Sequence, residues 1–420
     1  MQKPQKHALL AALAAVLGFA GLAHAQVYYD VMYRVGDPVP APMAAQITSA
    51  NFAGHTDVQI TLGQSFPGET TVSNAWLSAS LSSSTVPTIL TISLNPVGLQ
   101  VGSYSFIVET ADRINGVVYT GESALQYTVN LTVAGPTARV IASVVNAASF
   151  MMFGTGNFGS LPPPNLAAVS PGEVVSIFGY SLGPTTPLGL QFDSTGKVAT
   201  ELGGVQVFFN TSPCAAGISG CPTTAYAAPL TYVSATQINC VVPYEILTGN
   251  VVPQTIVQVE YLGQVVSSAV LQTADSFPGI FTATGTGTGQ AAALNSDNTP
   301  NTASNPAPAG SIVQVWMTGL GQISPAGVDG VVTCSSGCAT VSQIPKPIDP
   351  PLAAVGQLTL EGWPNEDATI AFYGEAPGLV SGVMQVNVVI PPDMPSGAAP
   401  LAIKAGGSTW TQAGVTIAVK

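Results

Sequence analysis

The sequence predicts an all-β protein that consists of three immunoglobulin-like β-sandwich units in tandem. Its 44 Gly and 34 Pro residues supply turns at short intervals, and Val- and Thr-rich runs favour strands. No apolar stripe at helical spacing occurs after the first 25 residues. A length of 420 residues fits about three domains, at roughly 150 residues for each domain.

A duplicated segment provides the strongest single indication of this architecture. Residues 170–183 (SPGEVVSIFGYSLG) return as residues 308–321 (PAGSIVQVWMTGLG) without a gap. Residues 237–243 (QINCVVP) return as residues 385–391 (QVNVVIP) at a longer offset. The two offsets indicate one duplicated unit with a longer loop in the second copy, and each copy constrains the interpretation of the other.

Each copy predicts a turn, a strand and a Gly-rich exit. The apolar side chains of the strand share one face by the two-residue period: Val175 and Ile177 in the first copy, Val313 and Val315 in the second. Phe178 and Trp316 occupy equivalent positions on the opposite face, which predicts a second packed surface.

The first 25 residues have the features of a secretory signal peptide. Lys3 and Lys6 begin the segment, an apolar run covers residues 8–20, and Ala23 and Ala25 form a small-x-small cleavage site. A membrane anchor is the alternative, but the run is shorter than the ~20 residues of a span. We therefore expect an exported protein that has no membrane span after cleavage.

The remaining chain divides into four segments. Strand signals recur every eight to twelve residues or so between residues 46 and 133, as expected for a sandwich. Prolines 162–164 resist both helix and central strand, which indicates a spacer. The predicted segments are a β-sandwich at 26–135, a Gly/Pro-rich connector at 136–165, and two halves at 166–274 and 275–420.

The five cysteines indicate local disulfides in an oxidising compartment. Cys214 and Cys221 flank one small-residue loop, and Cys334 and Cys338 flank another, so we predict one disulfide in each loop. A zinc site of four cysteines is the alternative, but their spacings do not match one. Cys240 takes the place of Val388 in the repeated strand, which predicts a buried thiol.

Charge and composition exclude several classes of function. The formal net charge is −12 and no Lys/Arg cluster occurs, so neither nucleic acid nor an anionic membrane is an expected partner. After the signal segment the chain has one histidine, His55, which removes histidine-dependent triads and histidine metal sites. No phosphate-binding glycine motif is followed by Lys and a helix. We expect no cofactor and no metal.

The acidic residues offer weak candidates for catalysis or for calcium. Glu173 begins a strand after a turn, and its repeat equivalent is Ser311. Glu245 and Asp393 both follow the proline that ends the repeated strand, which suggests a structural role near a turn. Glu366 and Asp367 are neighbours and would point to opposite faces of a strand. The loop 295–301 (NSDNTPN) could hold calcium through its oxygens, but one carboxylate is few for such a site and an Asx-rich turn is the alternative.

The four tryptophans matter because aromatic rings stack on sugars. Trp76, Trp316 and Trp410 lie in or beside expected strands and are expected in the core. Trp363 lies in a polar, turn-rich loop and is the best candidate for an exposed ligand-binding ring, with a Trp that caps the end of a sandwich as the alternative.

Two family resemblances accompany these observations. Trp76-Leu77, Asn95-Pro96, Leu99 and residues 102–104 make the first sandwich similar to the BACON family, an immunoglobulin-like domain of secreted bacterial proteins. That resemblance implies binding of carbohydrate or mucin. Residues 170–183, 204–209 and 237–243 resemble the IPT/TIG immunoglobulin-like domain.

The whole of about 140–420 resembles a C-terminal module of Solibacter-type Acidobacteria. The resemblance is carried by residues 146–149, 318–321 and the two QxN…P strands. The module has no established activity, so this resemblance implies a fold and not a chemistry.

Taken together, these features predict an exported, non-enzymatic binding or adhesion protein whose favoured partner is a polysaccharide or cell-surface glycan. A purely structural surface or matrix spacer is the alternative, and a glycoside-acting enzyme is the third hypothesis. The sequence alone leaves the ligand and the oligomeric state open.

Overall fold

The computed structural model describes residues 26–40, 42–47, 59–63, 71–73, 75–85, 88–114, 117–119, 126–135, 137–151, 168–211, 224–247, 254–335, 337–338, 340–358, 364–405 and 409–420. Their regular elements are strands and the short 3-10 turns η3 (Tyr244–Leu247) and η4 (Val341–Gln343). The predicted all-β class is confirmed, and the chain divides into two compact units at Ala138/Arg139. Within the described residues, no helix is long and apolar enough to cross a membrane.

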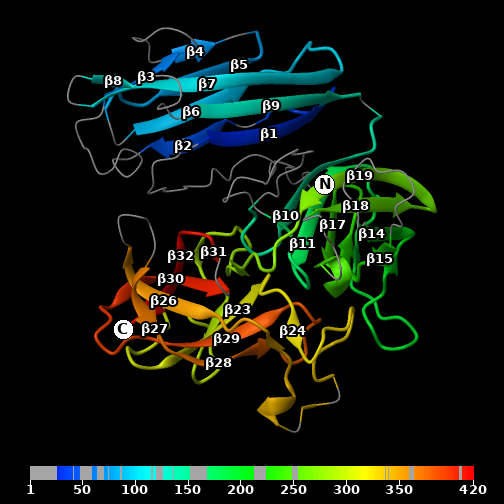
Figure 1. The fold of residues 1–420 in the computed structure, drawn as a ribbon, viewed down its shortest axis with the longest axis vertical. Helices are drawn as coiled ribbons and strands as arrows, with labels where there is room; N and C mark the ends of the chain where they lie inside the picture. Colours follow the sequence, from blue (N-terminus) through cyan, green and yellow to red (C-terminus); the bar gives the residue numbers. More distant parts are fainter. Residues whose placement is uncertain are drawn as a thin grey trace, which may run out of the picture. The chain divides into compact units, whose positions relative to one another are not determined.

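The first unit is a sandwich of two sheets, drawn in blue to cyan in Figure 1. β1 pairs β9 in parallel, and the other pairings in this unit are antiparallel. One sheet has the order β1 (Gln26–Arg34), β9 (Gln126–Ala134), β7 (Gly102–Ile114), β3 (Gln59–Gly63), with β8 (Val117–Tyr119) on β7. The other has the order β2 (Met43–Ile47), β6 (Thr88–Leu94), β5 (Leu77–Leu81), β4 (Thr71–Ser73).

The core of the first unit forms where the strands alternate apolar with polar residues. In β6 the buried side chains of Leu90 and Ile92 alternate with more exposed neighbours. Trp76 is 7% exposed and its ring centroid lies 6.1 Å from that of Tyr104. The prediction that Trp76 belongs to the core is confirmed.

The second unit begins with the first half of the duplication, which is green in Figure 1. Its two sheets enclose one core. The first sheet has the order β10 (Val140–Asn146), β11 (Val174–Tyr180), β17 (Gln237–Val241), β16 (Leu230–Val233), β12 (Leu188–Gly189). The second has the order β13 (Glu201–Leu202), β14 (Val205–Thr211), β18 (Gln254–Tyr261), β19 (Gln264–Gln272), with β15 (Thr224–Ala227) on β14.

Part of the segment predicted as a connector, residues 136–165, is a strand of the first half. Val140–Asn146 forms β10, which pairs with β11 and belongs to the first half. This segment is rich in β-branched residues, which favour strands, whereas the proline run that suggested a spacer lies downstream of it. That run lies outside the described residues.

The second half has the same two-sheet plan, coloured yellow to red in Figure 1. One sheet has the order β20 (Gly279–Ile280), β23 (Ile312–Thr318), β29 (Met384–Val389), β28 (Ile370–Glu375), with β22 (Ala293–Asn295) also on β23. The other has the order β21 (Gly289–Gln290), β32 (Val415–Val419), β30 (Gly397–Ala405), β26 (Leu352–Leu358), β27 (Pro364–Ala368), with β31 (Thr409–Trp410) on β30. A separate two-stranded ribbon is formed by β24 (Ile323–Ser324) and β25 (Lys346–Pro347).

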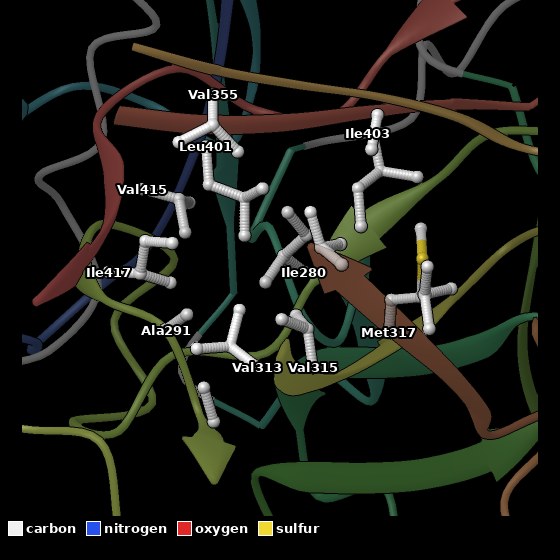
Figure 2. Packing of buried hydrophobic residues seen from close by; sticks show 14 of the residues in the cluster. Ile280, Ala291, Val313, Val315, Met317, Val355, Leu401, Ile403, Val415 and Ile417 are labelled. Carbon is white, nitrogen blue, oxygen red and sulfur yellow. The ribbon is translucent and has the colours of Figure 1, made fainter. Parts of the chain in front are cut away.

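Figure 2 shows the core of this half, where side chains of β23 face those of β26, β30 and β32. Val313 and Val315 are fully buried in it, and Val175 and Ile177 are fully buried in the core of the first half. The prediction that these four side chains share one equivalent face is confirmed.

The two halves also pair their strands in one register. Val175 lies opposite Cys240 in the first half, and Val313 lies opposite Val388 in the second. Each half has a register shift at the same place on the next strand, between Leu230 and Tyr232 and between Ile370 and Phe372. The duplication read from the sequence is therefore a duplication of strand pairing.

The cysteines follow the sequence prediction where the structure describes them. Cys334 and Cys338 form a disulfide with a Cα–Cα distance of 5.0 Å, whereas Cys214 and Cys221 lie outside the described residues. Cys240 is a free, fully buried thiol that packs in the core.

We expect Cys240 to be unreactive in the native protein. Burial raises the pKa of its thiol and suppresses the thiolate, which is the reactive form. Thiol labelling followed by mass spectrometry should find no label on the native chain and one label after denaturation without reductant. Labelling of native Cys240, or a second reactive thiol, would contradict this assignment.

Candidate functional site

The face of the β11/β17 sheet that points away from the core contains two aromatic and two amide side chains. Phe178 of β11 lies opposite Gln237 of β17, and Tyr232 of β16 lies opposite Asn239 of β17. Because Ile177 and Ile238 are buried in the core, their sequence neighbours point outward. All four residues are half-buried. We call them the first quartet.

The second half repeats this arrangement at the same register positions. Trp316 of β23 lies opposite Gln385 of β29, and Phe372 of β28 lies opposite Asn387 of β29. These four residues, the second quartet, are also half-buried. Trp316 is therefore not a core residue, and that prediction was wrong: it packs on the face opposite to Val315.

The amides of the two quartets make the same hydrogen bond. The Nε2 of Gln237 donates to the Oδ1 of Asn239 at 2.8 Å, and the Nε2 of Gln385 donates to the Oδ1 of Asn387 at 2.9 Å. Since these side chains lie two residues apart on one strand, they share one face of the sheet, and the bond ties the two amides together there. The aromatic rings on the flanking strands thus have a fixed polar strip between them.

The second quartet continues into a longer row of amides, which we call the amide ladder (Asn298, Gln314, Gln385 and Asn387). Gln385 Nε2 also donates to Gln314 Oε1 at 3.1 Å, and Gln314 Nε2 donates to Asn298 Oδ1 at 2.9 Å. In the first half the position of Gln314 is taken by Ser176, which is buried. The second half therefore has the more extended polar face.

Gly374 has three groups packed against its bare backbone. A Cβ at Gly374 would lie 3.0 Å from Ile344 Cγ2, 3.0 Å from Pro345 O and 3.3 Å from Phe372 Cζ. Gly374 lies opposite Gln385, which brings the ring of Phe372 next to the amides. The absence of a side chain at residue 374 thus leaves room for these three groups, of which Phe372 belongs to the second quartet.

Buried carboxylates form a separate group at the junction of the two halves. The carboxylate of Glu173 is fully buried; it accepts hydrogen bonds from Asn146 Nδ2 at 2.7 Å, Ser170 N at 2.7 Å and Ser170 Oγ at 2.9 Å. Burial raises the pKa of Glu173 to about 8, because it outweighs these hydrogen bonds, which lower the pKa. Glu173 is thus enclosed by the protein and held by its own turn.

Tyr244 connects the halves at this junction. Its hydroxyl lies 3.3 Å from Glu375 Oε1 and accepts a hydrogen bond from Ser381 Oγ at 3.2 Å. Its backbone N–H donates to Asp329 Oδ1 at 3.2 Å. Its ring lies against Gly172, where an added Cβ would lie 2.5 Å from the ring. These contacts clamp a residue of the first half into the second.

A carboxylate pair lies beside Tyr244. Burial and the negative charge of Glu245 raise the pKa of Asp329. Asp329 of this pair accepts the hydrogen bond from the backbone N–H of Tyr244. Thr333 Oγ1 donates a hydrogen bond of 2.7 Å to Oε2 of Glu375. Tyr244, Asp329, Glu375 and Ser381 did not emerge from the sequence, although one signal existed: Tyr244 occupies the place of Pro392 in the repeat.

The remaining candidate residues from the sequence lie either outside the described residues or at exposed or half-buried positions. His55 and Trp363 lie outside the described residues, so the role of Trp363 stays a prediction. Asp367 and Asp393 are exposed. Trp410 is half-buried with Lys404 Nζ 6.0 Å from its ring centroid, so it is not a fully buried core residue.

The loop 295–301 is a network of turn hydrogen bonds. Asp297 Oδ1 accepts from Thr299 N at 3.0 Å and from Thr299 Oγ1 at 2.6 Å, and Asn301 Nδ2 donates to Asn295 Oδ1 at 2.9 Å. These bonds correspond to the Asx-rich turn. No group of three or more His, Cys, Asp or Glu that could hold a metal occurs among the described residues.

Comparisons with known proteins return distantly similar solved structures and no family. No protein-family model and no curated protein matches the sequence. Similar solved structures include the Bacteroides ovatus mixed-linkage glucan utilization locus SGBP-B in complex with a mixed-linkage heptasaccharide (11% identity, 100% of this chain, 71% of that chain, TM-score 0.26). They also include the sialic acid binding region of a Streptococcus sanguinis SK1 adhesin bound to 3'sLn (11%, 94%, 76%, 0.19) and a family 2 glycosyl hydrolase from Bacteroides cellulosilyticus (13%, 63%, 24%, 0.19). The described residues form an all-β protein built of packed sheets.

Proposed function

We propose that this protein is an exported, non-enzymatic binding protein whose ligand class is carbohydrate. The observation that carries the proposal is the quartet of two aromatic rings and two amides at the same register positions in both halves. Aromatic rings offer apolar area to the C–H face of a sugar ring, and amides exchange hydrogen bonds with hydroxyl groups. Neither quartet contains a carboxyl group, a histidine, a lysine or a cysteine for catalysis.

The state of the carboxylates supports a binding role over catalysis. A glycoside hydrolase needs two carboxyl groups that flank a substrate. Glu173 and Glu375 are buried, and their oxygens accept hydrogen bonds from the protein itself. The Cys334–Cys338 disulfide supports export, because disulfides persist in oxidising compartments.

A structural spacer is the second candidate, and the clamped junction favours it. Tyr244, Asp329 and Glu375 join two sandwiches into one body, as a spacer that bears load requires. The proposed resemblance of residues 26–135 to the BACON family and of about 140–420 to the Acidobacteria-type module fits either candidate.

We expect Trp316→Ala to weaken polysaccharide binding about 30-fold. Truncation of a central aromatic at a binding surface costs about 2 kcal/mol, and each 1.4 kcal/mol is tenfold in affinity. Titration calorimetry of the full chain against a panel of polysaccharides measures the change. Trp410→Ala is the matched control, because Trp410 is also half-buried but lies on the other sheet of the same half.

Failure of the unmutated protein to bind any polysaccharide in the panel would favour the spacer instead. An affinity loss in Trp410→Ala as large as that in Trp316→Ala would show that the second quartet is not the binding site.

A further inference from the structure

The second quartet places its two rings at a separation that suits an extended sugar chain. Trp316 lies on β23 and Phe372 on β28, and β29 with its two amides lies between them. Neighbouring strands are about 4.8 Å apart, and Trp316 and Phe372 lie opposite β29 residues two positions apart, so their Cα atoms are roughly 12 Å apart on a diagonal across the sheet. An extended chain of two to three pyranose units covers a distance of that order.

The amides between the rings have unused hydrogen-bonding groups. Gln385 spends both N–H bonds of Nε2 on Gln314 and Asn387, and no partner within the described residues bonds its Oε1. Asn387 accepts through Oδ1, and its Nδ2 has no partner there either. A free acceptor beside a free donor matches hydroxyl groups, which both donate and accept.

The face has no charge of its own. Trp316, Phe372 and the four residues of the amide ladder are all neutral, so none of these six side chains supplies a cation to pair with a carboxylate or sulfate. The net charge of −12 adds repulsion of a polyanion at a distance. Sugar acids are thus disfavoured both locally and at long range.

We propose that the second half binds a neutral, linear polysaccharide that crosses its strands, with sugar rings on Trp316 and Phe372 and the intervening unit on the amides of Gln385 and Asn387. This inference rests on the proposed function and names its ligand. Gln314 and Asn298 extend the row by one strand and its adjoining loop beyond the quartet. The first quartet, with Ser176 in place of Gln314, offers a shorter version of the same site.

The test uses the full chain and linear β-1,4-linked oligosaccharides of glucose, mannose and xylose of increasing length. For at least one of these series we expect affinity to rise with length up to the span of the ladder and then level off. We expect carboxymethylcellulose, an anionic polymer with the same backbone as the glucan, to bind at least tenfold more weakly than the neutral chain at low salt. Asn387→Ala should weaken binding about fivefold, as for one lost hydrogen bond.

Gln258→Ala is the matched control, since Gln258 is a half-buried strand amide bonded to Glu260 on a different sheet. Equal or tighter binding of the anionic polymer, affinity that does not depend on length, or an Asn387→Ala effect no larger than the control would overturn this inference. In each of those cases carbohydrate binding itself stands. Binding to none of the neutral series, with binding to a branched or charged glycan, overturns this inference alone, whereas binding to no carbohydrate overturns the proposed function too.

Discussion

Replacement of Gly172 by alanine is expected to destabilise the second unit by about 2–5 kcal/mol. Gly172 has φ +68°, which costs an L-residue roughly 1–2 kcal/mol, and its new Cβ would lie 2.5 Å from the ring of Tyr244. Forced overpacking of this kind costs a further 1–3 kcal/mol or so. Displacement of the ring would also strain the hydrogen bonds of its hydroxyl with Ser381 and Glu375.

The duplication supplies a matched control for this prediction. Gly310 is the repeat equivalent of Gly172 and has φ +79°, but its added Cβ would lie 4.0 Å from the nearest atoms, in Pro392. Gly310→Ala should therefore cost only the roughly 1–2 kcal/mol of backbone strain. Denaturant unfolding measures both variants.

The same comparison in a Tyr244→Ala background isolates the contact. With the ring absent, Gly172→Ala should cost no more than Gly310→Ala, because only the shared backbone strain remains. Equal effects of the two substitutions with Tyr244 present would show that the ring does not press on Gly172.

The stability of the second unit is expected to fall as pH rises from about 4.5 to about 8. The pKa of Glu173 is about 8 in the folded protein and 4.5 without the fold, so between these values the native state binds more protons than the unfolded state. The contribution of Glu173 to the free energy of unfolding is therefore fully present below pH 4.5 and is lost as pH rises toward about 8. A pKa difference of this size corresponds to about 5 kcal/mol over the whole range.

Two variants identify the group responsible. Glu173→Gln should remove most of the decline with pH, while Glu201→Gln, which removes an exposed carboxylate, should leave it unchanged. The raised pKa of Asp329 acts in the same direction and should leave a smaller residual slope. Unfolding free energies that increase between pH 5 and pH 8 would contradict the prediction.

The strand pairing of the second unit could be predicted from the sequence to a useful depth. A constant offset within each repeated segment carries Val175 onto Val313 and Cys240 onto Val388, and the structure pairs them in that register. The reason is local: alternation in a strand decides which side chains face the core, and a repeat must obey it twice. The equivalent positions of Phe178 and Trp316 were visible by the same logic.

The sequence did not predict that Trp316 is only half-buried on the outer face of its sheet. It also did not predict the junction of the two halves at Tyr244. Whether an outward-facing ring such as Trp316 is covered or open depends on what packs over the sheet, and no pattern within one strand encodes that. Tyr244 and Glu375 are far apart in the sequence and meet only because two sandwiches dock. The sequence by itself thus determined the class, the repeat and the inward faces, which follow from local alternation. Only the tertiary structure decided the aromatic–amide face and the clamp at Tyr244, because both are made by segments that become neighbours after the sheets have formed.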